Sequence, residues 1–177
     1  MMLVLDEVDG GAGATCREIL QQLPAWFGIP AANQNYIETA DTSPGVIVTL
    51  DGDAVGVTTV KHHSPYAAEI YLMAVKPAHH RHGVGRRMLR RVEHRLATDG
   101  VEFLQVKTLS AARPDEAYAR TRAFWLACGF RPLEEFPTLW DPGNRRYSSS
   151  RQLLSGSRRS GALPGAIACR TFGDTRW

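Results

Sequence analysis

The sequence predicts a single α/β domain in which a mixed central β-sheet is flanked by helices. Apolar strands alternate along the chain with amphipathic helices, and one helix joins two buried strands, which must therefore run parallel. An Asp51-Gly52 turn joins two other strands as an antiparallel hairpin. A chain of 177 residues with 44% hydrophobic and 22% charged residues suits one independent core.

The central stretch, residues 67–96, has the pattern of a strand, a proline turn, a basic loop with two glycines, and a helix. The strand, residues 67–75, is apolar on both faces except at Glu69, as expected for a strand covered on both sides. Pro77 ends it, because proline lacks the N–H that a sheet ladder needs. From Val84 the apolar period becomes 3.6, and the opposite helix face is rich in arginine.

The loop before this helix has the features of a pyrophosphate-binding site. A helix N-terminus carries unpaired N–H groups and partial positive charge, and Gly83 and Gly85 let an anion approach that backbone. A nucleoside-triphosphate loop is disfavoured because Arg86 and Arg87 stand where Lys and Ser or Thr are needed. A dinucleotide fingerprint is disfavoured because Met88 replaces a small residue. A solvated basic helix remains the alternative.

Two motifs, in order, resemble the GNAT superfamily of N-acetyltransferases. The loop His80-Arg81-His82-Gly83-Val84-Gly85 is similar to the Gln/Arg-x-x-Gly-x-Gly/Ala loop of that family, with histidine at the first position. Residues 123–130, AFWLACGF, resemble the Phe-Tyr-x-x-x-Gly-Phe ending of the next helix in the family. The resemblance covers about residues 3–141.

This resemblance implies a GNAT fold and acetyl-coenzyme A as co-substrate, without a metal. In that fold the two parallel strands, here residues 67–75 and 103–108, splay apart, and the pantetheine arm enters the gap and pairs with the strand backbone. The implied coenzyme-binding residues are Met73, Ala74, Val75, His80, Arg81, His82, Gly83, Val84, Gly85, Arg86, Thr108, Tyr118, Phe124 and Trp125.

Acetyl transfer to an amine requires a base for the amine proton, a donor for the oxyanion, and a proton for the leaving thiolate. Glu69, a carboxylate in an otherwise apolar strand, is the candidate base, and many GNAT enzymes have a glutamate near this point; a structural ion pair is the alternative. The resemblance implies the Val75 N–H as oxyanion donor. Trp125 stands where the family commonly has a tyrosine that acts as the general acid, and an indole cannot take that role. Tyr118 therefore becomes the candidate acid, unless the thiolate departs without one.

The remaining pattern predicts strands over residues 1–8, 45–50 and 54–62, and helices after a Thr15–Glu18 capping box, over residues 31–40, and over residues 115–128. A final hairpin region is expected from residues 130–132 to residues 139–140. His62 and His63 at a strand end could reach an acceptor or be plain loop residues. The residues around the first two helices that could contact an acceptor, or simply pack in the core, are Trp26, Phe27, Asn33 and Tyr36.

The C-terminal part differs from the family pattern. Seven of the 21 Lys and Arg residues but only one of the 18 acidic residues follow position 144, so residues 1–143 are acidic overall and do not suggest a nucleic-acid binder. We divide the chain into a GNAT domain, 1–143, and an atypical Arg/Ser/Gly-rich tail, 144–177. Around residues 145–150 no closing strand is expected, although residues 152–154 or 166–169 could supply one.

Several classes of protein are disfavoured by the sequence. No apolar run approaches the ~20 residues that a membrane helix needs. The N-terminus carries Asp6 and Glu7 rather than a basic signal-peptide head, so we expect a cytoplasmic protein without a membrane partner. Cys16, Cys128 and Cys169 are odd in number and lack metal-ligand spacing, which disfavours a disulfide or zinc site.

The predicted function is therefore acetyl transfer from acetyl-coenzyme A to a primary amine by direct attack. The acceptor could be a small metabolite, an aminoglycoside-like amine or a peptide amine, and the chain could form a homodimer. A catalytically silent acyl-coenzyme A-binding module is the alternative. Nucleic-acid binding through the arginine-rich tail is a third, less favoured hypothesis.

Overall fold

The computed structural model describes residues 2–112, 114–136 and 146–153. It contains four α-helices, a short 3₁₀ helix and seven strands within those ranges. The helices are α1 (Gly13–Gln21), α2 (Pro30–Thr42), the 3₁₀ helix (Pro77–His79), α3 (Val84–Thr98) and α4 (Glu116–Ala127). The strands are β1 (Leu3–Val8), β2 (Gly45–Leu50), β3 (Asp53–Ser64), β4 (Ala67–Val75), β5 (Phe103–Leu109), β6 (Arg131–Phe136) and β7 (Arg146–Gln152).

The seven strands form one sheet in the order β1-β2-β3-β4-β5-β7-β6. Strands β1 to β4 pair as antiparallel neighbours, β4 and β5 pair in parallel, and β7 lies between β5 and β6 with antiparallel pairing on both sides. The parallel pair follows from the α3 crossover, because a helix that links two neighbouring strands of one sheet carries the chain back to the same end. The predicted mixed α/β sheet is confirmed.

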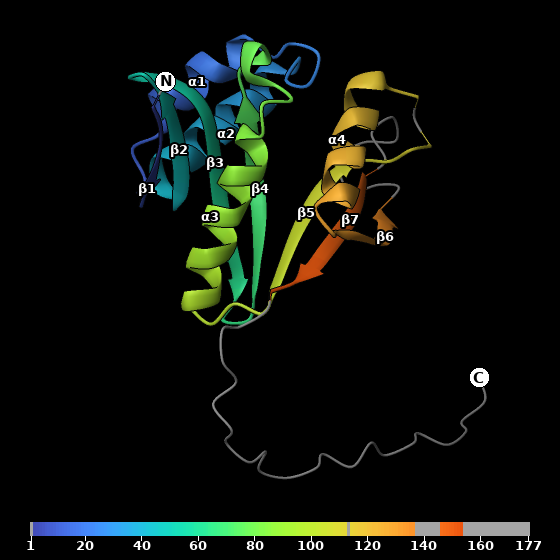
Figure 1. The fold of residues 1–177 in the computed structure, drawn as a ribbon. Helices are drawn as coiled ribbons and strands as arrows, with labels where there is room; N and C mark the ends of the chain where they lie inside the picture. The colour runs from blue at the N-terminus through green and yellow to red at the C-terminus, as the bar shows by residue number, and fades with distance from the viewer. Residues whose placement is uncertain (1, 113, 137–145, 154–177) are drawn as a thin grey trace, which may run out of the picture.

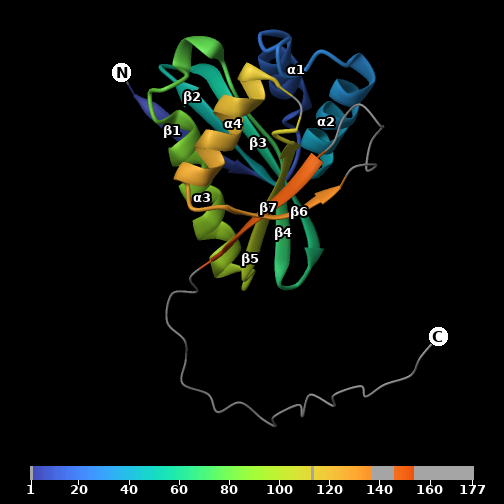
Figure 2. The ribbon, with the colours of Figure 1, turned by 90° about the vertical axis from the view of Figure 1, so that its right-hand side faces the viewer.

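Helices α3 and α4 lie on one face of the sheet and α1 and α2 on the other (Figure 2), and an apolar core lies on each face. The larger core contains the apolar face of α3 together with Trp125, Cys128 and Phe130 from the α4 region. The smaller core packs α1 and α2 against β3 and β4 through residues such as Ile19, Ile37 and Leu72. The sheet is therefore covered on both faces, which explains why residues 67–75 are apolar on both sides.

The expectation that no strand closes the sheet around residues 145–150 is wrong. Strand β7 pairs along its whole length with β5, from Phe103 opposite Gln152 to Leu109 opposite Arg146. Ser148 and Ser149 are buried there, so short hydroxyl side chains take the place of the expected apolar residues. Two-sided pairing rather than hydrophobicity holds this strand. The part of the predicted tail up to residue 153 thus belongs to the sheet, whereas residues 154–177, including the alternative strand 166–169, lie outside the described residues.

The predicted capping box at the first helix is also wrong. Helix α1 begins at Gly13, two residues before Thr15, and its N-cap, Ala12, makes no side-chain cap. The carboxylate of Asp41, at the end of α2, accepts the Gly13 N–H instead, with 2.7 Å between Oδ1 and N. A Cβ on Gly13 would lie 2.2 Å from that carboxylate, so a glycine is required where α1 starts.

Other predicted elements match within one to three residues, and β2 matches at both ends. The final hairpin region contains β6, and the predicted residues 139–140 lie outside the described part of the chain. Within the described ranges, no helix combines the length and apolarity that a bilayer crossing requires.

Candidate active site

The two parallel strands separate part of the way along their length (Figure 1). Pairing between β4 and β5 runs from Ala67 opposite Phe103 to Ile70 opposite Val106 and goes no further. Strand β4 nevertheless continues to Val75, paired only with β3, and β5 continues to Leu109, paired only with β7. The edge of β4 that faces β5 therefore has unpaired backbone groups beyond Ile70, beside the place where the strands diverge.

A β-bulge at Tyr71 changes which residues of β4 face each core. Val60 pairs with Ile70 and Thr59 with Leu72, so Tyr71 is the extra residue. Ala68 and Ile70 contribute to the core beneath α3, whereas Leu72 and Ala74 contribute to the core beneath α1 and α2. Glu69, Tyr71 and Leu72 consequently share the sheet face on the α1–α2 side, immediately next to the start of the gap.

The predicted pantetheine contacts on β4 differ in where their backbone groups point. The Lys76 N–H donates to the Val55 carbonyl at 2.8 Å, so the backbone N–H and C=O groups of Lys76 point toward β3. Since backbone groups alternate along a strand, Met73 and Val75 direct their N–H and C=O groups toward the gap, and those of Ala74 face β3. The Val75 carbonyl is contacted at 2.7 Å by Nε2 of His80, the first residue of the glycine loop. The loop is thus anchored to the end of β4.

The glycine loop leads into a helix N-terminus without a side-chain cap. Gly83 is the N-cap of α3 with a φ of 79°, in the left-handed region that glycine favours, and the Arg87 N–H is the donor to the Gly83 carbonyl. The amides of Val84, Gly85 and Arg86 precede that bond, so they have no intrahelical partner. A Cβ on Gly83 would meet nothing within 4 Å, and Arg81, Arg86 and Arg87 are exposed nearby in sequence. This geometry suits a bound phosphate group.

Gly85 has a different neighbour. A Cβ at Gly85 would lie 3.4 Å from Cζ of Phe124, so the first turn of α3 packs closely against this ring of α4. The structure therefore brings Phe124 next to the glycine loop. The adjacent Trp125 is buried and packs against Phe130, with ring centroids 5.0 Å apart, in the core beneath α3.

Tyr118 and Trp26 link the two halves of the molecule across the gap. The Tyr118 hydroxyl donates to the Trp26 carbonyl at 3.0 Å, and the Trp26 indole N–H donates to the Ala117 carbonyl and to the Thr121 hydroxyl. The Trp26 ring also makes an edge contact with His80, with centroids 5.7 Å apart. Residues after α1 thus reach α4 at the open end of the gap, where the glycine loop also lies.

Thr108 lies on β5 beyond the last pair with β4. Its side chain is buried, and its hydroxyl has no hydrogen-bond partner among the described residues. A buried hydroxyl without a partner costs about 1–3 kcal/mol, so a ligand with a polar group at this position would be favoured. Among the predicted coenzyme-binding residues, Thr108 is the one with a buried, unpartnered polar atom.

Glu69 is buried and makes two polar contacts through a single oxygen. Its Oε2 lies 2.7 Å from Nζ of Lys107 on β5 and 2.7 Å from Nε2 of His63 on β3. The Glu69 side chain is only 6% exposed, whereas that of His63 is 40% exposed. The carboxylate is therefore compensated by the Lys107 ammonium and has a route to solvent through the His63 imidazole.

The sequence did not single out Lys107, Lys61 or Tyr71 as site residues. Lys107 lies between buried residues of β5, and this alternation in the sequence could have indicated that its side chain lies on the opposite face of the sheet from theirs. Nζ of Lys61 lies 3.4 Å from the Tyr71 ring centroid, and the Tyr36 ring lies 5.3 Å from Tyr71. Of the predicted acceptor contacts, Tyr36 is thus near Glu69's face of the sheet, and Phe27 packs edge-on against Tyr36.

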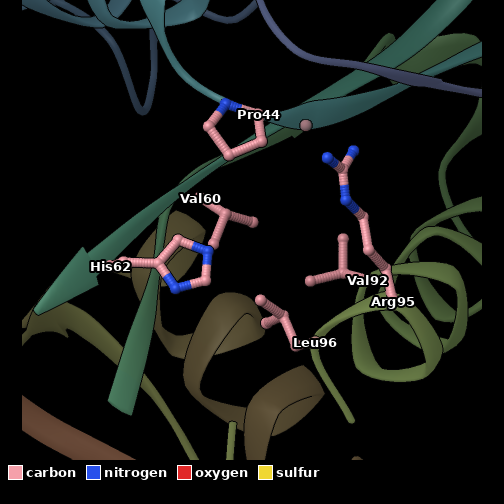
Figure 3. Close-up of a pocket in the computed structure, with 7 residues that line it drawn as sticks. Pro44, Val60, His62, Val92, Arg95 and Leu96 are labelled. Carbon is pink, nitrogen blue, oxygen red and sulfur yellow. The ribbon is translucent and has the colours of Figure 1, made fainter. Parts of the chain in front are cut away.

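A separate small cavity lies on the opposite face of the sheet from Glu69 (Figure 3). It lies between α3 and the neighbouring parts of β2 and β3, has a volume of about 10 Å³, and is lined by residues including Val60, His62 and Arg95. Such a volume holds at most one water molecule. Among the residues that the structure describes, no three His, Cys, Asp or Glu side chains gather as a metal site requires.

Comparison with solved structures confirms the predicted GNAT fold. A GNAT-family protein from Desulfovibrio desulfuricans superimposes with a TM-score of 0.76 at 18% identity, over 86% of this chain and all of that one. The ribosomal-protein-S18-alanine N-acetyltransferase of Escherichia coli has a TM-score of 0.70 at 16% identity, over 92% and 100% of the two chains. A GNAT acetyltransferase from Elizabethkingia anophelis with acetyl-CoA bound has a TM-score of 0.65 at 13% identity, over 85% and 98%.

Comparison at the level of sequence identifies the family. No curated protein sequence matches the chain. The profile of the acetyltransferase (GNAT) family, however, matches residues 15–130, which include the glycine loop, both splayed strands and α4. The chain therefore belongs to the GNAT family of acetyltransferases.

Proposed function

We propose that the protein is an N-acetyltransferase that moves an acetyl group from acetyl-coenzyme A to a primary amine by direct attack. One observation carries this proposal. Strands β4 and β5 separate beside the N-terminus of α3, which begins after Gly83, has no side-chain cap and carries exposed arginines. Family membership supports acetyl transfer in general. That the acceptor is a primary amine is part of our proposal.

The residues of the gap fit acetyl-coenzyme A. The amides of Gly83 to Arg86 and the exposed arginines would hold the pyrophosphate. The unpaired N–H and C=O groups of Met73, and the N–H of Val75, would pair with the pantetheine amides as an added strand does. The buried hydroxyl of Thr108 offers a further hydrogen bond, and Phe124 lies beside the loop. When bound, the thioester supplies an activated acetyl group.

In the proposed mechanism Glu69 acts as the base. The amine nitrogen attacks the thioester carbonyl, the C–S bond breaks, and the amine proton passes to the Glu69 carboxylate through water. From there His63, which contacts the same carboxylate and is partly exposed, can carry the proton to solvent. The Val75 N–H is proposed as the oxyanion donor.

Tyr118 remains the proposed acid for the leaving thiolate. Its hydroxyl donates to the Trp26 carbonyl, so it would have to exchange that bond for one to the sulfur atom. Thiolate departure without an acid is the alternative, since a thiolate is a good leaving group. A Tyr118→Phe variant separates the two.

The test is thiol release from acetyl-coenzyme A in a panel of amines, for wild type and Glu69→Gln. We expect Glu69→Gln to lower kcat by about a hundredfold or more, as loss of a general base does, with an unchanged affinity for acetyl-coenzyme A. Glu102→Gln, which changes an exposed carboxylate, is the matched control and should have wild-type turnover. Equal turnover in Glu69→Gln would contradict the assigned base.

A catalytically silent acyl-coenzyme A-binding module is the second candidate. Its support is the burial of Trp125, at the position where relatives commonly have a tyrosine acid, and the contacts of Glu69 with the Lys107 ammonium and the His63 imidazole. Tight coenzyme binding without turnover on any amine would favour this candidate over the enzyme.

A further inference from the structure

Five side chains from three adjacent strands form a polar cluster on the face of the sheet that α1 and α2 partly cover. We name it the β3–β5 cluster: Lys61, His63, Glu69, Tyr71 and Lys107. Register places Lys61 opposite Glu69 and Glu69 opposite Gln105, so these residues share one face, and Lys107 follows two residues after Gln105. The contacts of Glu69 with Lys107 and His63, and of Lys61 with Tyr71, confirm that the five side chains lie together.

The cluster lies where an acceptor has to arrive. The last pair of β4 with β5 is Ile70 with Val106, so Tyr71 and Lys107 are the first residues on either side of the gap. Glu69 precedes that point by one residue and belongs to the same face as both. An amine that is to attack an acetyl group delivered through the gap must therefore pass next to these side chains.

Positive charge exceeds negative charge in the β3–β5 cluster. It contains two ammonium groups and an imidazole but a single carboxylate, Glu69, which is already in contact with Lys107 and His63. Lys61 lies over the Tyr71 ring and has no carboxylate partner among the described residues. The next carboxylate by register is that of Glu134, two strands from Lys107 and exposed. The ammonium of Lys61 is therefore available for an anionic group.

We infer that the acceptor is a small amine that also carries an anionic group, a carboxylate or a phosphate, rather than a polycation. This inference rests on the proposed function and adds the substrate class. The anionic group binds Lys61, the amine nitrogen lies toward Glu69, and the Tyr71 and Tyr36 rings contact the carbon skeleton between them. A polyamine or aminoglycoside would instead bring further positive charge against Lys61 and Lys107.

Matched amines test the inference. Phenylalanine is compared with phenylalaninamide and phenethylamine, and O-phosphoethanolamine with ethanolamine, while spermidine and kanamycin represent polycations. We expect kcat/KM to be at least tenfold higher for an anionic member than for its neutral counterpart, and lowest for the polycations. A preference within the phenylalanine series assigns a carboxylate, and one within the ethanolamine series a phosphate. A polycation or a neutral amine as the best substrate would overturn the inference.

A variant of Lys61 tests whether this residue causes the preference for anionic amines. Lys61→Gln should raise KM for the anionic amine about tenfold and leave KM for its neutral counterpart within twofold, with little change in kcat. Lys76→Gln, which breaks the exposed pair with Glu18, is the matched control and should keep the preference. An unchanged preference in Lys61→Gln would contradict the assignment.

Binding separates this inference from the proposed function. Calorimetric titration of the coenzyme A complex with each amine measures affinity without any need for turnover. If no amine is acetylated but anionic amines bind at least tenfold more tightly than neutral ones and Lys61→Gln abolishes the difference, the proposed function fails and the anionic site stands. Absence of any such difference overturns the anionic site whatever the enzyme turns over.

Discussion

The carboxylate of Glu69 shows how one side chain depends on residues far from it in the sequence. Its Oε2 contacts Lys107, 38 residues later, and His63 across the β3–β4 turn. Removing either partner would leave a buried charge with less compensation, and such losses are costly because the interior solvates ions poorly. At this site stability and the proposed chemistry therefore depend on the same contacts.

Cys16 gives a prediction on thiol reactivity. Burial, together with the nearby Asp41 carboxylate, raises the pKa of the Cys16 thiol to about 12, and burial also raises the pKa of Cys128. At pH 8 only about one Cys16 thiol in ten thousand would be ionised, and the thiolate is the reactive form. In a Cys169→Ser variant, which leaves these two cysteines, we expect no rapid reaction with a disulfide reagent in the native protein.

Denaturation supplies the control for this experiment. Both thiols should react within the mixing time once the chain is unfolded, since burial no longer suppresses ionisation. A rapid reaction of one thiol in the folded variant would contradict the burial of the corresponding cysteine.

Glu93 gives a prediction on pH dependence. Burial raises the pKa of this carboxyl above its ordinary 4.5, although Arg151 and Arg90 act in the opposite direction. A raised pKa means that the folded state favours the protonated form of Glu93. The contribution of this carboxyl to the free energy of unfolding is therefore fully present below about pH 4.5 and is lost as the pH rises through the folded-state pKa. We therefore expect Glu93→Gln to unfold at higher denaturant concentration than wild type at pH 7, with the difference vanishing near pH 4.

Arg151 provides the matched comparison for Glu93. Its Nη1 donates to Glu93 at 2.8 Å and to the Cys128 carbonyl at 2.7 Å, which joins β7 to α3 and α4. Arg151→Met should lower the free energy of unfolding by about 1–2 kcal/mol at pH 7, and by less in a Glu93→Gln background. A Glu93→Gln variant that is less stable than wild type at pH 7 would contradict the sign given above.

At the scale of elements, β7 decides whether the sheet is continuous. Ser149 is buried in this strand and pairs with Val106 of β5 on one side and with Pro132 of β6 on the other. Ser149→Pro removes an N–H from an interior strand and should lower the free energy of unfolding by about 3 kcal/mol or more, measured by chemical denaturation. Ser149→Ala keeps the N–H and should cost less than half as much. Equal stability of the two variants would contradict the interior position of β7.

The bulge of β4 is the second element on which the site depends. If the strand alternated strictly through Tyr71, Glu69 and Leu72 would lie on opposite faces of the sheet. With the bulge, Glu69, Tyr71 and Leu72 share the α1–α2 face, and the unpaired edge of the strand begins at the same point. The bulge thus turns Leu72 and Ala74 to the face of the sheet on which Glu69 lies.

At the scale of the whole molecule, local patterns predicted most of the fold. The apolar, β-branched run of residues 45–50 and the 3.6-residue period from Val84 mark β2 and α3, because each signal is contained within a single segment. The glycine loop was found for the same reason, since Gly83 and the helix that follows it are adjacent in sequence.

Features that depend on tertiary contacts were not predictable in this way. The serines of β7 carry no hydrophobic signal, and their strand exists because β5 and β6 pair with it. The start of α1 is fixed by Asp41, 28 residues after Gly13, rather than by a local cap. In the sequence, Lys107 and Lys61 are ordinary polar residues on strands. Only the pairing of the strands brings Lys107 into contact with Glu69 and Lys61 into contact with Tyr71.

The most direct test of the account is calorimetric titration of acetyl-coenzyme A into wild type and two isosteric variants, Gly83→Asn and Gly83→Asp. Both side chains tolerate the left-handed backbone at this position, and they differ only in charge. If the α3 N-terminus holds the pyrophosphate, wild type binds acetyl-coenzyme A at micromolar concentration, and Gly83→Asp binds at least tenfold more weakly than Gly83→Asn at equal stability. Equal affinity of the two variants, or absence of binding to wild type, would contradict the assignment of this loop to the coenzyme.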